Sequence, residues 1–250
     1  MSALLEVRGL SKRFGGLLAL SQVNFSLAEG EILGLIGPNG AGKTTLFNLL
    51  NGAFKPDQGS VVLAGENVTG WPPNQMVRQG LARTHQIVKP LSNLTVLENV
   101  TVGACFGRDH LPLKDARKVA REVLEFVGLA DRLTLPARSL TIAGKKRLEV
   151  ARALAAHPRL ILLDEVLSGL NPSEVAPMVD LVRLLPERGI AVFIIEHLMQ
   201  AIMGLSHRII VLNFGEKIAE GCPEEIAHHP QVIEAYLGDP HIAVRLMESA

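Results

Sequence analysis

The residue pattern with the most specific chemistry runs from Gly37 to Thr45. It fits G-x-x-x-x-G-K-[ST], with an apolar run before it and another after it. Glycines let backbone N–H groups converge on an anion, and a following helix N-terminus adds partial positive charge. Lys43 can then reach the β- and γ-phosphates of a nucleotide, and the Thr44 hydroxyl can ligate Mg²⁺. The pattern predicts a nucleoside triphosphate site made by these residues: Gly37, Pro38, Asn39, Gly40, Ala41, Gly42, Lys43, Thr44 and Thr45.

Two adjacent acids, Asp164 and Glu165, follow the apolar run 160–163. Ligands of open α/β sheets bind outside the carboxyl ends of the strands, so we expect this pair at the nucleotide. Asp164 is suited to hold Mg²⁺, and Glu165 can orient and deprotonate an attacking water. The alternative is a solvated acidic turn, which the glycine-rich segment upstream disfavours.

Two further polar side chains are candidates. His197 follows the apolar run 190–195 and could contact the γ-phosphate or the water, although a histidine in such a place is often structural. Gln86 has a neutral amide that can meet both metal and water, and its chemistry alone leaves the functional and the structural interpretation open.

The elements that must position these groups follow from hydrophobic periodicity. The first thirty residues alternate apolar and polar positions around Gly15-Gly16, which indicates antiparallel strands. Buried strands, including a closing hairpin, are expected at these places: 32–36, 60–64, 160–163, 190–195 and 209–219. Helical patterns cover 113–127 and 145–156. We therefore predict an α/β nucleotide-binding core that a mainly helical insertion interrupts over about 89–156.

Composition narrows the class of protein. The chain has 250 residues, of which 48% are hydrophobic and 20% charged, as in a folded globular protein. The formal net charge is zero, so no nucleic-acid partner is expected. Two isolated cysteines are too few for a disulfide framework. Neither a signal peptide nor an apolar run long enough to span a membrane is evident, which predicts a soluble polypeptide.

Together these motifs resemble the ATP-binding subunit of ABC transporters, over nearly the whole chain. The segment 139–155 stands where that family carries its signature motif and the following helix, and 168–172 looks like its D-loop. Gln86 resembles the Q-loop glutamine, His197 the switch histidine, and Phe14 the aromatic residue that stacks on adenine.

The resemblance implies a fold, a partner and site residues. The fold would be α/β, a P-loop NTPase (RecA-like) core with an N-terminal antiparallel β-subdomain and an inserted α-helical subdomain, as one ATP-binding domain over 1–250. Two such subunits would sandwich two ATP molecules head to tail. The implied groups are catalytic Glu165, His197 and Gln86, Mg²⁺ ligands Thr44, Gln86 and Asp164, and signature residues Thr141, Ala143 and Gly144 that bind the partner's ATP.

The chain departs from the family pattern at two places. Ala143 stands where a glycine normally permits close backbone approach, so the contact with ATP requires a φ below zero there, while Thr141 keeps a hydroxyl. Asn171 replaces the usual aspartate of the D-loop. Either change could slow one composite site, and the alternative is a subfamily variant with full activity.

A narrower resemblance is to the branched-chain amino acid uptake subfamily. It lies in the following segments: 11–16, 93–100, 169–172, 195–197 and 233–238. It implies import at the cytoplasmic face of a bacterial inner membrane, with membrane permease subunits, a second ATP-binding subunit and a periplasmic solute-binding protein. Importers of urea or short amides look similar. A non-transport ABC-type regulatory ATPase and a small-molecule kinase are the other candidates, although adjacent acids favour water over a kinase acceptor.

Overall fold

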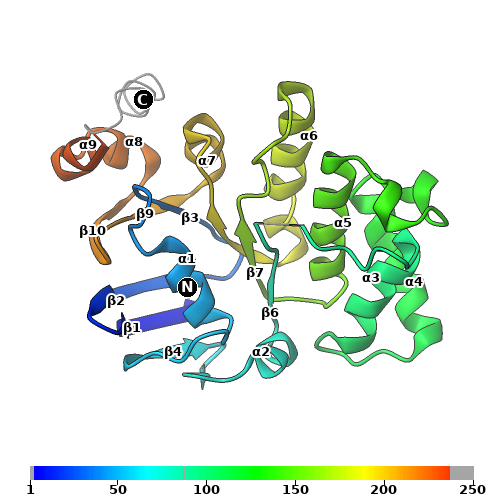
Figure 1. Ribbon diagram of the computed structural model, residues 1–250, viewed down its shortest axis with the longest axis horizontal. Coiled ribbons are helices and arrows are strands. Elements are labelled where there is room, and N and C mark those ends of the chain that lie inside the picture. Colours follow the sequence, from blue (N-terminus) through cyan, green and yellow to red (C-terminus); the bar gives the residue numbers. More distant parts are fainter. Residues whose placement is uncertain (1–2, 87, 237–250) are drawn as a thin grey trace. The chain divides into compact units, whose positions relative to one another are not determined.

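The structure, a computed structural model, describes residues 3–86 and 88–236. These residues form two compact units (Figure 1). The first unit consists of the chain up to Pro73 and from Leu185 onward, and the second of Asn74–Leu184. The α/β class predicted above is confirmed. The predicted single domain over 1–250, with its insertion over about 89–156, stays a prediction.

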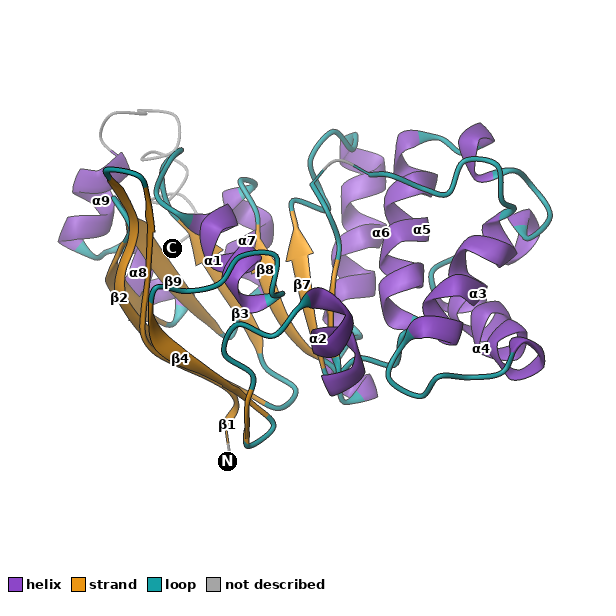
Figure 2. Cartoon of the chain, turned by 60° about the horizontal axis from the view of Figure 1, so that its bottom comes forward, coloured by secondary structure: helices purple, strands orange, loops and turns teal. Residues whose placement is uncertain are grey.

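An antiparallel sheet opens the first unit. Its strands are β1 (Ala3–Phe14), β2 (Leu17–Ala28), β4 (Gln58–Leu63) and β5 (Glu66–Asn67), in the order β2-β1-β4-β5. The turn at Gly15-Gly16 joins β1 to β2, since Phe14 lies opposite Leu17. Figure 2 shows the long curved ribbons of this sheet. The predicted antiparallel strands around Gly15-Gly16 are confirmed.

A second sheet of the first unit carries the glycine-rich segment. Its strands are β3 (Ile32–Ile36), β8 (Ala191–Ile195), β9 (Arg208–Asn213) and β10 (Glu216–Gly221). β3 runs parallel to both β8 and β9, and β10 closes the predicted hairpin antiparallel to β9. All five residues of β3 are buried, as expected of a central parallel strand. The helices of this unit are α1 (Lys43–Leu50), α7 (Met199–Leu205), α8 (Pro223–Ala227) and α9 (Pro230–Tyr236).

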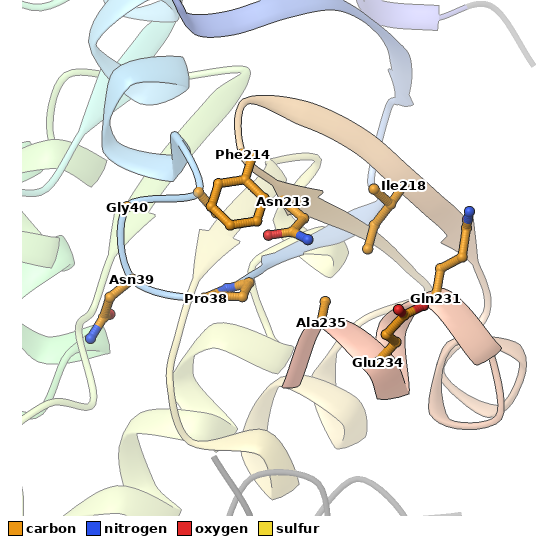
Figure 3. A pocket seen from close by; sticks show the side chains of 10 residues that line it. Pro38, Asn39, Gly40, Asn213, Phe214, Ile218, Gln231, Glu234 and Ala235 are labelled. Carbon is orange, nitrogen blue, oxygen red and sulfur yellow. The ribbon is translucent and has the colours of Figure 1, made fainter. Parts of the chain in front are cut away.

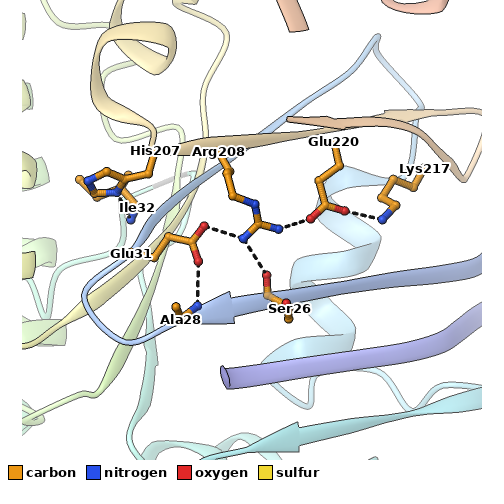
Figure 4. Close-up of polar contacts among 8 residues, drawn as sticks. All are labelled: Ser26, Ala28, Glu31, Ile32, His207, Arg208, Lys217 and Glu220. Carbon is orange, nitrogen blue, oxygen red and sulfur yellow. Dashed lines mark hydrogen bonds and ion pairs between the residues drawn. The ribbon is translucent and has the colours of Figure 1, made fainter. Parts of the chain in front are cut away.

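A polar network joins the two sheets of the first unit (Figure 4). Arg208, at the start of β9, donates to Glu31 at 2.7 Å and also pairs with Glu220 of β10. Glu31 in turn accepts the backbone N–H of Ala28, the last residue of β2, at 2.7 Å. Because Glu31 is only 9% exposed, its pairing offsets the cost of burying a charge. The network connects the end of β2 to β9 and β10.

The second unit combines a short parallel strand pair with helices. β6 (Leu81–Arg83) runs parallel to β7 (Leu160–Asp164). The helices are α2 (Pro73–Gln79), α3 (Val96–Phe106), α4 (Leu113–Phe126), α5 (Ile142–Leu154) and α6 (Pro172–Arg183). α3, α4 and α5 pack on one another. The helix predicted over 113–127 is confirmed, and most of the chain between 89 and 156 is helical as predicted.

The start of α5 differs from the prediction. The sequence pattern placed it at Lys145, whereas the helix begins at Ile142. The reason is a cap: the Thr141 hydroxyl accepts the backbone N–H of Gly144 at 3.2 Å. The exposed Ile142 interrupts the apolar stripe that periodicity detects, so the first turn was missed.

Candidate functional site

The glycine-rich segment connects β3 to α1 in the first unit, as predicted. Gly37 has a φ of +153°, and a Cβ there would lie 2.1 Å from the backbone oxygen of Leu212. Gly42, the N-cap of α1, has a φ of +103°. Both positions therefore require glycine. The start of α1 carries the partial positive charge of a helix N-terminus, so this end is suited to bind phosphate.

Lys43 is the first residue of α1 and is only 7% exposed. Its Nζ donates to the backbone oxygens of Gly37 at 2.6 Å and of Pro38 at 2.9 Å. The ammonium group is thus held against the loop that surrounds it. A cation beside backbone N–H groups at a helix start is the chemistry that binds polyphosphate.

Phe14 ends β1 with its ring 41% exposed. Phe54 packs edge-to-face against it at 5.2 Å between ring centroids, and the Lys12 ammonium lies 5.5 Å from the centroid of Phe14. Lys12 is itself bound to Asp57 at 2.8 Å and lowers the pKa of that carboxyl. Phe14 was among the predicted site residues and Phe54 was not, because no local pattern links residues forty positions apart.

A cavity of about 560 Å³ adjoins the outer part of the glycine-rich segment (Figure 3). It is lined by Pro38, Asn39, Gly40, Ala41, Asn213, Phe214, Ile218, Gln231, Glu234 and Ala235. Phe214 is 88% exposed and has a φ of +45°, an uncommon conformation for a bulky residue. Through Gln231, Glu234 and Ala235, helix α9 lines the same cavity as the glycine-rich segment.

His197 follows the carboxyl end of β8, also in the first unit. Ile195 of β8 lies opposite Leu35 of β3, so both strands end at the same edge of the sheet. The glycine-rich segment leaves one strand at this edge and His197 follows the other. The structure thus brings these two predicted site elements to one sheet edge.

In the second unit, Asp164 is the last residue of β7 and is 3% exposed. Its Oδ2 accepts a hydrogen bond from Arg83 Nη2 at 2.7 Å, and Arg83 ends the neighbouring strand β6. The Asp164 backbone N–H donates to the Thr84 hydroxyl at 3.1 Å. Arg83 and Thr84 were not among the predicted site residues, although both belong to the segment Arg83-Thr84-His85-Gln86.

Glu165 is also buried, at 9% exposure, and has a left-handed φ of +52°. Its Oε2 accepts a hydrogen bond from Gln86 Nε2 at 2.7 Å. The Nζ of Lys146 donates to the Glu165 backbone oxygen at 2.6 Å. The structure therefore brings together Gln86 and Glu165, which are 79 positions apart. An acid held next to an amide can orient a water molecule.

The two departures from the family pattern now have a structural setting. Ala143 lies in the first turn of α5 and is not among the residues with positive φ, so the condition on its backbone is met. Thr141 is the N-cap of the same helix. Asn171 caps α6 by accepting the backbone N–H of Glu174 at 3.0 Å. The loss of charge at Asn171 thus leaves its capping role intact.

Two kinds of feature are absent from the described residues. Across 3–86 and 88–236, no group of three or more His, Cys, Asp or Glu is arranged to hold a metal ion. Over the same part of the chain, no helix has the length and apolarity to traverse a bilayer. Leu237 and Gly238, part of a segment that resembles the branched-chain subfamily, lie outside the described residues.

Comparison with known families gave two matches. Residues 20–168, more than half of the chain, match the model described as "ABC transporter". Residues 216–242 match the model described as "Branched-chain amino acid ATP-binding cassette transporter". The second match includes β10, α8 and α9, the last of which lines the cavity in Figure 3.

Curated relatives cover almost the full length. The chain is 41% identical to the high-affinity branched-chain amino acid transport ATP-binding protein LivG of Salmonella typhimurium, over 94% of this chain and 98% of the relative. It is 38% identical to BraF of Pseudomonas aeruginosa, also a high-affinity branched-chain amino acid transport ATP-binding protein, over 94% of this chain and 98% of the relative. The lipopolysaccharide export ATP-binding protein LptB of Acidithiobacillus ferridurans is 34% identical over 96% and 98%.

Solved structures agree with the fold. The ADP conformation of MJ1267, an ATP-binding cassette of an ABC transporter, superposes with a TM-score of 0.87 at 31% identity, covering 96% of this chain and all of the other. A dimeric post-hydrolysis cassette, MJ0796 bound to ADP and Pi, gives a TM-score of 0.78 at 26% identity, covering 87% of this chain and 98% of the other. The predicted cassette fold is confirmed.

Proposed function

Because the chain belongs to the ABC transporter family of ATP-binding proteins, we propose that it hydrolyses ATP to energise uptake of branched-chain amino acids. Two observations support this cargo: full-length similarity to LivG and BraF, and the separate match of residues 216–242 to a branched-chain model. The observation that carries the hydrolytic activity is the buried Glu165, held by Gln86 at the end of β7.

The proposed roles in nucleotide binding follow from chemistry in the first unit. The N–H groups of the loop and the Lys43 ammonium would bind the phosphates. The exposed ring of Phe14 would stack on adenine, with Phe54 supporting its edge. His197, at the sheet edge where the loop begins, would sense the γ-phosphate.

The proposed Mg²⁺ ligands are Thr44, Gln86 and Asp164. Hydroxyl, amide and carboxylate oxygens are hard donors, which Mg²⁺ prefers. A set of only three protein ligands suits Mg²⁺, because this ion keeps several waters and also binds substrate phosphates. When bound, Mg²⁺ would neutralise charge on the phosphates.

Glu165 would act on the attacking water as general base. Its carboxylate accepts the water's proton while Gln86 fixes its orientation through the 2.7 Å hydrogen bond. The remainder of catalysis is positioning and charge stabilisation by Lys43 and the loop N–H groups.

The proposed assembly contains a second ATP-binding subunit, whose ATP would bind to Thr141, Ala143 and Gly144 at the start of α5. Membrane permease subunits and a periplasmic solute-binding protein complete it, with this chain peripheral on the cytoplasmic face. The full-length similarity to transport ATP-binding proteins supports these partners. An ATPase of a urea or amide importer is the alternative for the cargo.

The activity is tested with Glu165→Gln and the matched control Glu122→Gln, an exposed residue of α4. We expect Glu165→Gln to bind ATP, to favour a stable dimer and to release no phosphate, because an amide is a poor base. Glu122→Gln should behave as wild type. Undiminished phosphate release by Glu165→Gln would contradict the assigned base.

The cargo is tested by uptake in cells that lack the gene. We expect radiolabelled leucine uptake to fall and urea uptake to stay at its original rate. The opposite result would favour the amide importer and leave the ATPase assignment standing.

A further inference from the structure

The helix α5 carries two buried charged side chains on one face. Lys146 is 6% exposed and Glu149 is 5% exposed. They are three positions apart, so they project from the same side of the helix. Burial of a charge is costly unless partners compensate it. The partners of these two side chains therefore indicate why the helix keeps them.

Lys146 holds the backbone of the proposed catalytic residue. Its Nζ donates to the Glu165 oxygen at 2.6 Å, a charge-assisted hydrogen bond. Glu165 is one of six non-glycine residues with positive φ among the described residues. This conformation is unfavourable for an L-residue. The contact with Lys146 therefore stabilises a strained backbone at Glu165 itself.

Glu149 holds the segment that contains Gln86. Its Oε1 accepts the backbone N–H of His85 at 2.8 Å. Burial raises the pKa of Glu149, while the hydrogen bond from His85 acts in the opposite direction and favours the carboxylate. Arg152, one turn further along the helix, lies 3.9 Å from the same carboxylate. The Glu149 side chain thus fixes the backbone directly before Gln86.

The contacts made by Lys146 and Glu149 both lie beside the Gln86–Glu165 pair. Gln86 and Glu165 are hydrogen-bonded to each other at 2.7 Å, and α5 holds the backbone beside each of them. The same helix begins at the signature residue Thr141, its N-cap. At about 1.5 Å rise per residue, Lys146 and Glu149 lie only about 8 and 12 Å from that end.

We propose that Lys146 and Glu149 are positioning residues through which the signature helix sets the geometry of Gln86 and Glu165 in its own chain. This inference rests on the proposed function. Binding of the partner's ATP at the start of α5 moves or fixes a rigid helix, and the two side chains carry that change to the catalytic pair. The two ATP sites of a dimer are then coupled through α5.

The decisive variants are Lys146→Met and Glu149→Leu, with Lys146→Arg and Glu149→Gln as conservative partners. Lys145→Met is the matched control, because Lys145 is the neighbouring, more exposed lysine of α5. We expect kcat for ATP hydrolysis to fall at least tenfold in Lys146→Met and Glu149→Leu. The dissociation constant for ATP should stay within twofold, because the loop residues are unchanged. Arg and Gln keep a donor and an acceptor respectively, so these variants should stay within threefold of wild-type kcat.

Amide hydrogen exchange gives a second, local measurement. Lys146→Met should accelerate exchange at 165–168 and Glu149→Leu at 85–86, with no change in the loop 37–45. A kcat within twofold of wild type, an equal loss of ATP affinity and kcat, or unchanged local exchange would overturn the inference.

Glu165→Gln in the same assay separates this inference from the proposed function. If Glu165→Gln hydrolyses ATP at the wild-type rate, the proposed function fails. If Glu165→Gln is inactive while Lys146→Met is fully active, only the role of α5 fails.

Discussion

The phosphate loop of the first unit and the acid cluster of the second hold their functional groups in different ways. The loop is shaped by backbone: glycine conformations, a helix start, and backbone oxygens that bind Lys43. The cluster is shaped by side chains from three separate segments, through Arg83–Asp164, Gln86–Glu165 and Lys146–Glu165. Substitutions in the loop should therefore act on binding, and substitutions in the cluster on turnover and folding.

The largest effect is expected from Gly37→Ala, in the phosphate loop. A Cβ at Gly37 would lie 2.1 Å from the Leu212 oxygen, a backbone atom that has little room to move. We expect ATP binding to be lost, as measured by fluorescence titration with a labelled ATP analogue, together with a lower melting temperature. Gly40→Ala is the control, because a Cβ there meets nothing within 4 Å and only its φ of +79° is unfavourable. Wild-type affinity in Gly37→Ala would show that the loop tolerates displacement.

The same contrast explains what could be predicted from sequence. The loop is a contiguous pattern with its strand directly before it and its helix directly after it, so this local fold was predicted correctly. The role of its residues in binding ATP stays a prediction. Asp164 was predicted from its strand, but its partner Arg83 is 81 positions away. In the sequence, Lys146 and Glu149 look like charged residues on the exposed surface of a helix. Their burial depends on how β6, β7 and α5 pack, and one sequence does not contain that information in any local pattern.

An intermediate effect is expected from Arg83→Met. The change leaves the 3% exposed Asp164 without its 2.7 Å partner inside the protein. Breaking a buried ion pair in this way costs about 3 kcal/mol of unfolding free energy, because the remaining charge stays buried. Chemical denaturation measures this cost, with Arg78→Met as control because Arg78 is exposed. A change in unfolding free energy no larger than that of the control would show that Asp164 is stabilised by other groups.

The smallest effect is expected from Phe54→Leu, in the first unit. The ring centroids of Phe54 and Phe14 lie 5.2 Å apart in an edge-to-face arrangement, and such aromatic pairs contribute about 0.5–1.5 kcal/mol beyond burial. Because we propose that the Phe14 ring stacks on adenine and Phe54 packs against that ring, loss of the Phe54 ring should weaken ATP binding about two- to threefold, with kcat unchanged. Phe106→Leu, at a residue 70% exposed in the second unit, is the control. A fall in kcat without a change in ATP affinity would mean that Phe54 acts on turnover, as the acid cluster is expected to do. That result would contradict the division between loop and cluster.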